Sequence, residues 1–508
     1  MSFRSLALGL SLALAAALPV TAAEPGAQAR APAHEGQGVL GLLPPDAVSD
    51  HVLNVGGQAI PYTATAGTLD LFGQDGERTA AMFYTAYIAK DRGEAGDRPI
   101  TFVFNGGPGA SSAYLNLGLV GPRTVDFGPT GHDGAAAKLV DNPNSWLAFT
   151  DLVLIDPIGT GWSRTVKPDD AADFYGVRPD AESIAKAISL YVNRNGRAAS
   201  PKYLLGESYG GLRSAKVASV LREEQGILVS GIVMLSPLIE GQFVFGGDSQ
   251  PFGAALQLPS LAAAELERRG TFSETAVKDA ERFAMHDYLP TLAGPPPQGD
   301  EAKAFYEHVA QLTGIPADVV ARKQGYLGDA YVKHSAQDPA DVVSPYDAAL
   351  SVPDPYPESE TDRSDDPILE GFTRAYGGAF TSYARDELGF KTDMTYTLLS
   401  GDVNGHWKWG GNRGGSRSDA SATDDIRQLL SVVPSFRLLV AQGYSDLVIP
   451  YSGNKYILEH LPPAVADRAS LKLYRGGHMF YTRPESRAAF TADARAFFAA
   501  SAAAPRSE

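Results

Sequence analysis

Cysteine is absent from this 508-residue chain. Without a thiol the protein can form no disulfide, and no cysteine side chain is available for a lipid anchor. The asparagines also lack the Asn-X-Ser/Thr pattern of N-glycosylation acceptors. Together with the N-terminal segment described below, these absences favour a bacterial periplasmic or secreted protein over a eukaryotic glycoprotein.

Positive charge is also scarce. The chain has 43 Lys and Arg against 59 Asp and Glu, a formal net charge of −16. An acidic surface argues against nucleic acid and against anionic membranes as partners. No motif calls for a metal or an organic cofactor, so we expect neither.

Long apolar runs are missing except at the N-terminus. Residues 1–23, "MSFRSLALGLSLALAAALPVTAA", contain one arginine, an apolar stretch and then small residues. This pattern is typical of a secretory signal peptide, with cleavage after Ala22 or Ala23. A retained membrane anchor is the less favoured alternative, because the apolar run is shorter than a bilayer span. We therefore expect an exported protein.

Short apolar runs recur along the rest of the chain, and each stops at Gly, Pro, Asp or Ser. They are Ile100–Gly107, Asp151–Pro157, Tyr203–Ser208, Gly231–Pro237, Phe436–Gly443 and Leu471–Gly477. Most are apolar on both alternating faces, as in buried parallel strands. Helical patterns lie between several of them, for example Ile184, Ile188 and Tyr191 at helical spacing. Strand–helix alternation predicts a doubly wound, mostly parallel α/β sheet.

The organisation predicted from these patterns has a core in two parts. Residues 24–241 form the first part, which includes an antiparallel hairpin at residues 52–90 along the leading edge of the sheet. Residues 242–430 are interrupted by Pro-rich and acidic stretches and contain helix-like segments, so we interpret them as a largely helical insertion that caps the site. Residues 431–508 complete the core.

A serine stands at a sharp strand-to-helix transition in "YLLGESYGG", residues 203–211. The segment Gly206–Gly210 is G-x-S-x-G, the pattern of a nucleophile elbow, which exposes the serine hydroxyl above a sheet. The helix that follows points its N-terminal amides at the same place. The pattern alone is weak, and a tight glycine turn with an incidental serine is the alternative.

A serine nucleophile needs a base, and the base needs an orienting group. In the α/β-hydrolase fold the expected order is Ser, then Asp or Glu, then His, each after a strand. Asp446 follows one downstream strand and His478 follows the next. These contexts favour Ser208, Asp446 and His478 as the reacting set. The glycine-rich stretch "FNGGPGASS" at residues 104–112 occupies the position from which this fold supplies an oxyanion-hole amide.

At this point the chain resembles the serine carboxypeptidase family, in five motifs that keep the order of the family. They are "NGGPGASS", "DNPNSW" with "LIDPIGTGWS", "GESYGG", "YSDLVIPYSG" and "GGHMF", between Asn105 and Phe480. The resemblance implies the α/β-hydrolase fold and hydrolysis of C-terminal residues from peptides through an acyl-enzyme.

The resemblance also implies residue roles. Ser208 would attack the scissile carbonyl, His478 would transfer the proton, and Asp446 would fix the imidazole. The backbone amides of Gly107 and Tyr209 would form the oxyanion hole.

Three further positions correspond to those that hold the terminal carboxylate of the substrate in the family: Asn105, Gly106 and Glu207. For Glu207 the alternative is a variable elbow residue that faces solvent. The chain departs from the family at two places. Ala110 stands where the family often has a cysteine, and Leu119 stands where it commonly has a second Glu that pairs with the first.

Several other functions stay open at the level of the sequence. A proline iminopeptidase-like peptidase or an esterase would use the same fold, although the former typically has His where Asn105 stands. An acyltransferase would pass the acyl group to an alcohol. A catalytically inactive binding protein is the least favoured alternative, because Ser208, Asp446 and His478 are all present.

Overall fold

The structure is a computed structural model that describes residues 38–90, 96, 98–128, 131–245, 249–359, 365–410 and 415–502. The predicted signal peptide, residues 1–23, lies outside the described residues. None of the helices in the described part of the chain combines the length and apolar character that a membrane span requires.

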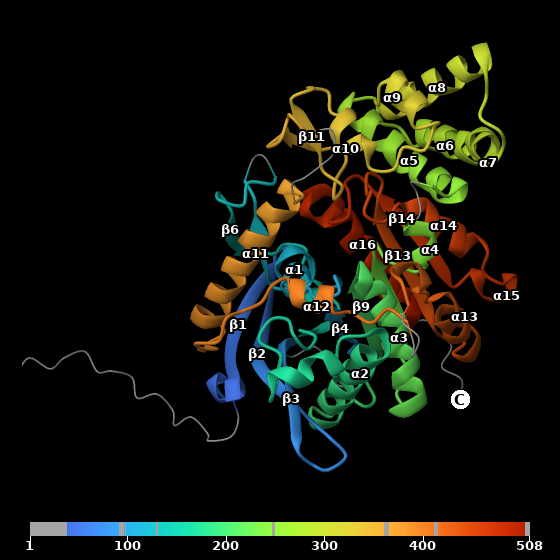
Figure 1. Cartoon of the computed structure of the whole chain (residues 1–508). Helices are drawn as coiled ribbons and strands as arrows, with labels where there is room; N and C mark the ends of the chain where they lie inside the picture. Colours follow the sequence, from blue (N-terminus) through green and yellow to red (C-terminus); the bar gives the residue numbers. More distant parts are fainter. Residues whose placement is uncertain are drawn as a thin grey trace, which may run out of the picture.

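A ten-stranded sheet forms the centre of the molecule (Figure 1). In spatial order its strands are β1 (Ala47–Val55), β2 (Gln58–Phe72), β3 (Arg78–Ala89), β7 (Asp151–Ile155), β4 (Ile100–Phe104), β9 (Lys202–Glu207), β10 (Gly231–Leu235), β13 (Arg437–Gly443) and β14 (Ala469–Tyr474), with the short β8 (Arg164–Thr165) beside β3. From β7 to β14 each strand runs parallel to the next one in this order, whereas β7 pairs antiparallel with β3 on its other side. The predicted α/β class with a mostly parallel sheet is confirmed.

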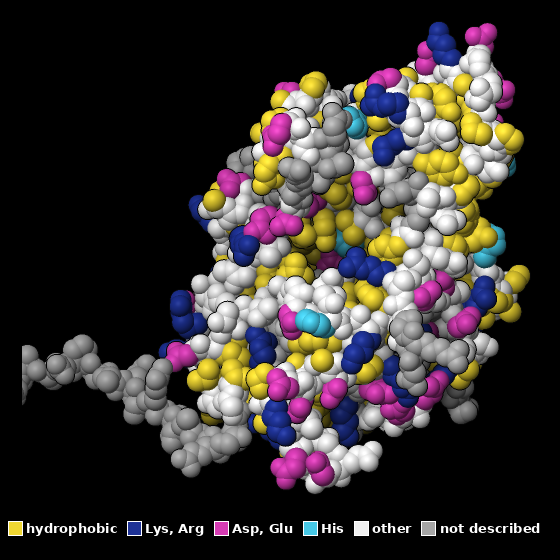
Figure 2. Space-filling view, viewed as in Figure 1, with side chains coloured by type: hydrophobic (Ala, Val, Ile, Leu, Met, Phe, Trp, Pro, Cys, Tyr) yellow, Lys and Arg dark blue, Asp and Glu magenta, His cyan; other side chains and the backbone are white. Residues whose placement is uncertain are grey.

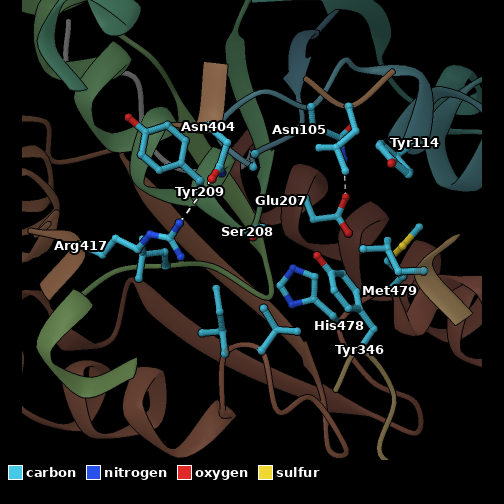
Figure 3. Close-up of a pocket in the computed structure, with 18 of the residues that line it drawn as sticks. Asn105, Tyr114, Glu207, Ser208, Tyr209, Tyr346, Asn404, Arg417, His478 and Met479 are labelled. Carbon is cyan, nitrogen blue, oxygen red and sulfur yellow. Dashed lines mark hydrogen bonds between the residues drawn. The ribbon is translucent and has the colours of Figure 1, made fainter. Parts of the chain in front are cut away.

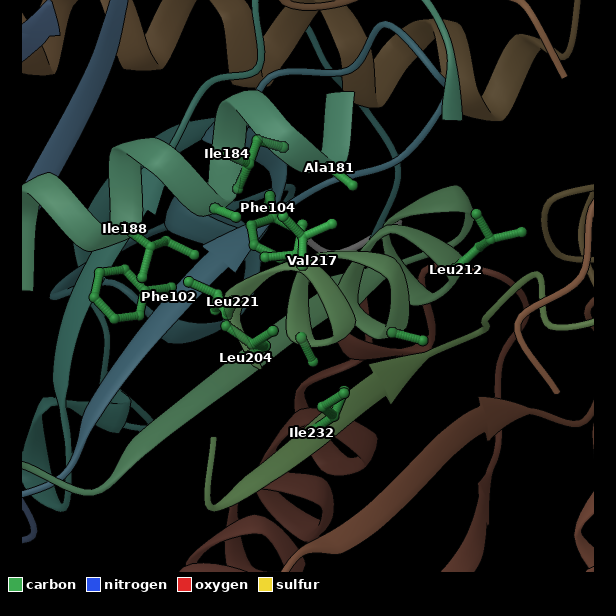
Figure 4. Close-up of a cluster of buried hydrophobic side chains, with 14 of the residues drawn as sticks. Phe102, Phe104, Ala181, Ile184, Ile188, Leu204, Leu212, Val217, Leu221 and Ile232 are labelled. Atoms are coloured by element: carbon green, nitrogen blue, oxygen red, sulfur yellow. The ribbon is translucent and has the colours of Figure 1, made fainter. Parts of the chain in front are cut away.

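The parallel strands are apolar on both faces because each face carries its own hydrophobic core. In β4, Phe102 and Phe104 belong to one core, and Val103 between them belongs to the other. The first core lies under α2 (Val177–Arg194) and α3 (Tyr209–Glu224), whose apolar side chains pack on the sheet (Figure 4). Burial on both faces explains why these strands show no alternation of apolar and polar residues.

The second core is covered by two segments that lie far apart in the sequence. Helix α16 (Pro484–Ala502) contributes Phe490 and Phe498, and helix α11 (Pro367–Asp386) contributes Tyr376 and Phe380. The last helix and one helix of the predicted insertion therefore close the same face of the sheet.

The antiparallel edge is larger than the predicted hairpin. Strands β2 and β3 pair antiparallel, and β1 pairs with β2 on its other side. Val48 and Val52 of β1 are exposed, and Leu53 is buried. Because β1 mixes exposed and buried apolar residues, its apolar pattern is weak, and the predicted edge, which begins at residue 52, starts inside this strand.

The chain between β10 and β13 forms a mainly helical region. It contains α4 (Gly241–Val244), α5 (Pro251–Arg268), α6 (Glu274–Phe283), η5 (Ala284–Tyr288), α7 (Leu289–Ala293), α8 (Gly299–Thr313), α9 (Ala317–Arg322), α10 (Ala330–His334), β11 (Asp341–Val343), β12 (Ser351–Pro353), α11, α12 (Gly401–Gly405), η6 (Arg417–Asp419) and α13 (Thr423–Val432). The segment from α5 to α10 has a hydrophobic core of its own and forms the lobe at the top of Figure 1. Helix α13 instead packs on α3 and belongs to the layer that covers the sheet.

A buried ion-pair cluster fixes the start of β7. The carboxylate of Asp151 lies 2.7 Å from Nε of Arg98 and 2.7 Å from Nη1 of Arg197. All three side chains are largely buried, so the two guanidinium groups depend on this carboxylate for compensation of their charge.

We predict that Asp151→Asn lowers the free energy of unfolding by about 3–5 kcal/mol, because it leaves buried cations without an anion. The matched control is Asp318→Asn in α9, which breaks an exposed pair with Arg322 and should change stability little. Thermal unfolding of both variants checks this expectation. Equal, small shifts in melting temperature would contradict the structural role of Asp151.

Candidate active site

Ser208 stands between β9 and α3 with φ 60° and ψ −127°. Positive φ is strained for a residue with a side chain, at a cost of about 1–3 kcal/mol. The surrounding backbone holds this conformation. The N–H of Ser208 donates to the carbonyl of Leu235 at 2.9 Å, and its carbonyl accepts from Gly211 at 2.9 Å and from Leu238 at 3.0 Å.

The glycines of the nucleophile elbow allow neighbouring backbone segments to pack in direct contact. A Cβ on Gly206 would overlap the carbonyl group of Gly210, and one on Gly210 would lie 2.8 Å from the carbonyl oxygen of Phe104. On the facing loop, a Cβ on Gly106 would lie 2.6 Å from the amide nitrogen of Tyr209. The glycine-rich loop after β4 therefore lies directly against the elbow.

Asp446 and His478 form a buried hydrogen-bonded pair. Nδ1 of His478 lies 2.9 Å from Oδ2 of Asp446. The other carboxylate oxygen accepts the backbone N–H groups of Val448 at 3.0 Å and Ile449 at 2.9 Å. Asp446 is fully buried. The carboxylate is thus fixed on one side by backbone and presents its second oxygen to the imidazole.

The environment of His478 favours its protonated form. Burial opposes protonation, but the charge and the hydrogen bond of Asp446 outweigh it, with a contribution from Glu207, and raise the pKa of His478 above its ordinary value. The Oγ of Ser236 donates to the backbone carbonyl of His478 at 2.8 Å. The ring of Tyr346 packs edge-on against the imidazole at 5.2 Å between centroids.

These residues open on a cavity of about 280 Å³. Figure 2 shows this face of the molecule hollowed between the helical lobe and the sheet, with hydrophobic side chains around the hollow. Seven of the eight residues predicted for the site line this one cavity (Figure 3): Asn105, Gly106, Gly107, Glu207, Ser208, Tyr209 and His478. The eighth, Asp446, lies behind His478. Within the described residues, no group of three or more His, Asp or Glu side chains is arranged to hold a metal ion.

Gly107 and Tyr209 line the cavity, and their backbone amides have no hydrogen-bond acceptor among the described residues. Gly107 has φ +97°, a conformation that favours glycine. Within the described part of the chain, neither its N–H nor that of Tyr209, the first residue of α3, donates a hydrogen bond to another residue. These donors lie on either side of the contact between the loop and the elbow, so an anionic oxygen beside Ser208 could accept from both.

Glu207 points into the protein and not into solvent, with a side chain that is about 4% exposed. Its carboxyl accepts a hydrogen bond from the side-chain amide of Asn105 (Figure 3). Burial raises the pKa of Glu207 to about 7, although the charge of His478 and the hydrogen bonds from Tyr481 and Asn105 act in the opposite direction. The carboxyl group is therefore substantially neutral at mildly acidic pH.

The second hydrogen-bond partner of Glu207 is a phenol. Tyr481 OH lies 2.9 Å from Oε1 and 3.0 Å from Oε2. The ring fits because Gly118 has no side chain: a Cβ there would lie 2.7 Å from the ring of Tyr481. Leu119, where the family commonly has a second Glu, is fully buried and does not line the cavity. Glu207 thus receives its second hydrogen bond from a tyrosine near the other end of the chain.

A buried arginine anchors the backbone of Asn105. Arg213 of α3 donates to the carbonyl oxygen of Asn105 and to Asp180, with Nε 2.7 Å from Oδ2. Its guanidinium carbon also lies 4.9 Å from the centroid of the Tyr209 ring. One side chain therefore ties together the glycine-rich loop, the elbow helix and α2.

Sequence reasoning did not identify Tyr481, Ser236, Tyr346 or Arg213. Tyr481 offered a signal, because it follows His478 by three residues in "GGHMFY". Ser236 and Tyr346 gave none, since their partner His478 lies more than a hundred residues away in the sequence. Arg213 gave none either, because its hydrogen bond to the Asn105 carbonyl joins two segments that are far apart in the sequence.

Comparison with known proteins gives one family. The family model described as serine carboxypeptidase matches residues 60–240. The pheromone-processing carboxypeptidase KEX1 of Cryptococcus gattii is 33% identical over 164 residues, which are 32% of this chain and 23% of that protein. Serine carboxypeptidase-like 44 of Arabidopsis thaliana is 29% identical over 184 residues, 35% of each chain. The matches thus span 23% and 35% of the length of these two relatives.

Among solved structures, a prohormone-processing carboxypeptidase of Saccharomyces cerevisiae, Kex1(delta)p, matches 86% of this chain and 91% of its own, with a TM-score of 0.53. The sequence identity is 14%, so this likeness concerns the fold alone.

The raised pKa of Glu207 predicts a specific loss of stability with pH. The folded protein holds this proton up to about pH 7, whereas an unfolded glutamate releases it near pH 4.3. Between these values the folded state binds more protons, so stability falls as pH rises.

We expect the melting temperature of the wild type to fall, relative to that of Glu207→Gln, between pH 5 and pH 8. The glutamine cannot ionise, so it removes this contribution, which is on the order of 3 kcal/mol. Differential scanning fluorimetry of both proteins across this range measures it. Parallel curves would show that Glu207 is ionised in the folded protein.

Proposed function

Because the chain belongs to the serine carboxypeptidase family, we propose that it is an exported serine-type carboxypeptidase that releases C-terminal residues from peptides. The observation that carries this proposal is the buried, hydrogen-bonded Glu207 next to the strained Ser208, in a cavity that also contains His478. A general esterase has no need of a proton-bearing carboxyl group at this position.

In the proposed reaction, Ser208 Oγ attacks the scissile carbonyl and His478 accepts its proton. Asp446 bonds Nδ1, which leaves Nε2 of the imidazole as the proton acceptor. The proton then passes to the leaving amine, and an acyl-enzyme ester remains on Ser208. Water attacks this ester with His478 again as base, which releases the shortened peptide.

The negative charge that develops on the carbonyl oxygen would be met by the N–H groups of Gly107 and Tyr209. In the described part of the chain neither N–H donates a hydrogen bond to another residue, so both donors would be free to bind the oxygen when the charge forms. Removal of one such donor typically costs about 3–4 kcal/mol of barrier.

The terminal carboxylate of the substrate would bind at Glu207 and Asn105. An ionised Glu207 would repel it, whereas the neutral carboxyl can donate a hydrogen bond to it. The environment that keeps the proton on Glu207 up to about pH 7 therefore has a role in selecting free C-termini. Tyr481 orients the carboxyl without adding a second negative charge.

The helical insertion would restrict access to the cavity, so that only the ends of peptide chains could enter it. Several lining residues come from the chain between β10 and β13: Phe245, Tyr346, Leu369, Leu399, Asn404, Trp409 and Arg417. We propose peptides with a free C-terminus as the substrates, water as the acyl acceptor, and export directed by residues 1–23.

Mass spectrometry of a peptide pool incubated with the protein tests the proposed reaction. We expect successive losses from the C-terminus and no cleavage of the same peptides as C-terminal amides. Ser208→Ala should abolish the losses while the melting temperature stays within a few degrees of the wild type. Internal cleavage, or equal cleavage of acids and amides, would contradict the proposal.

A second prediction concerns pH. For peptide acids, kcat/KM should fall about tenfold per pH unit above about pH 7, as Glu207 ionises. Esters without a free carboxylate should not show this fall, because they need only neutral His478. Glu207→Gln, which keeps a donor and cannot ionise, should remove the alkaline limb for peptide acids. Identical profiles for both substrate types in the wild type would exclude carboxylate recognition by Glu207.

A further inference from the structure

The cavity has two chemically different halves on either side of Ser208. Figure 3 shows Asn105 with the carboxyl of Glu207 on one side, and Arg417 with Asn404 on the other. The first half offers an amide and a buried carboxyl group. The second contains the one arginine or lysine that lines the cavity among the described residues.

Arg417 has aromatic and amide neighbours but no anion. Its Nη2 donates to Oδ1 of Asn404 at 3.3 Å, and its guanidinium carbon lies 6.0 Å from the ring centroids of Phe245 and Trp409. Within the described residues no carboxylate lies within 4.0 Å of its nitrogens, and the side chain is exposed to the cavity. An arginine next to aromatic rings is well suited to bind a planar carboxylate with two hydrogen bonds.

Two acidic side chains near the segment that carries Arg417 have other hydrogen-bond partners. Asp419 accepts the N–H of Ser416 at 2.7 Å, and Glu240 accepts the hydroxyl of Ser421. Neither carboxylate is therefore committed to the guanidinium. The charge of Arg417 remains available to a substrate.

The backbone holds Arg417 in place. Ser416 and Asp419 form a capping box around η6, and Gly241 donates to the carbonyl of Ala420 at 2.7 Å. Asn404, whose Oδ1 accepts the hydrogen bond from Arg417, donates its side-chain N–H to the carbonyl of Pro108 at 3.2 Å. The cation is thus attached to the same glycine-rich loop that borders Ser208.

The position of the substrate follows from the proposed function, on which this inference rests. If Glu207 and Asn105 bind the terminal carboxylate, the C-terminal residue fills the half of the cavity that contains them. The scissile carbonyl then lies at Ser208. The side chain of the penultimate residue, which precedes the scissile bond, must then extend into the opposite half of the cavity, toward Arg417.

We propose that Arg417 makes this half a subsite for an acidic side chain, so that the protein prefers peptides whose penultimate residue is Glu or Asp. A charged hydrogen bond between guanidinium and carboxylate distinguishes Glu from the isosteric Gln. For a pair that is partly exposed to water, we expect about a tenfold preference in kcat/KM, the lower end of the range for such bonds.

The test uses acetylated peptides of sequence Ala-Ala-X-Leu with a free carboxylate, where X is Glu, Gln or Lys. Leucine is constant because Tyr114 and Met479 lie on the side of the cavity that contains Asn105 and Glu207 (Figure 3). Release of leucine gives kcat/KM for each peptide with the wild type, with Arg417→Gln and with the control Arg322→Gln, whose guanidinium lies exposed on α9. Melting temperatures verify that each variant is folded.

For the wild type and for the control, we expect kcat/KM to be highest for the peptide with Glu, lower with Gln and lowest with Lys. In Arg417→Gln the ratio of Glu to Gln should fall from about 10 to about 1, and 0.5 M NaCl should reduce the wild-type ratio through screening. The inference is overturned by a wild-type ratio near 1, by a ratio that Arg417→Gln leaves unchanged, or by an equal loss on all three peptides. Release of leucine from none of them by the wild type would refute the proposed function, and this inference with it.

Discussion

The backbone contact between the nucleophile elbow and the glycine-rich loop determines the geometry of the whole site. Ser208 keeps a strained conformation because hydrogen bonds from Leu238 and Gly211, and to Leu235, fix its peptide groups. The loop approaches so closely that Gly106 has no room for a side chain. This one contact places the serine, the candidate oxyanion amides and the Asn105 side chain in a single arrangement.

Burial sets the electrostatics of this arrangement. His478 and Glu207 are both buried, yet their pKa values rise for different reasons: the charge of Asp446 stabilises the imidazolium, and desolvation destabilises the carboxylate of Glu207. Tyr481 supplies Glu207 with a hydrogen bond and no charge. If a second carboxyl group stood beside Glu207 in place of the phenol, the protonation of each carboxyl group would depend on the charge of the other. With Tyr481 as the partner, Glu207 binds and releases its proton as a single carboxyl group.

The sequence was sufficient to predict the central sheet and the positions of Ser208 and His478, because short apolar strands and their terminal residues are local signals. It was not sufficient to predict the walls of the cavity. Arg417 and Tyr346 come from the insertion, where no periodicity shows which residues face the site. The pairing of Tyr481 with Glu207 depends on space at Gly118, a relation between three distant segments that no local pattern records.

Covalent labelling of the serine tests the central claim most directly. A fluorophosphonate should attach to Ser208, and peptide mapping by mass spectrometry should find the adduct on that residue alone. The rate should fall by at least about 10³-fold in His478→Ala, because the hydroxyl loses its base. An adduct on another serine, or an unchanged rate in His478→Ala, would contradict the account.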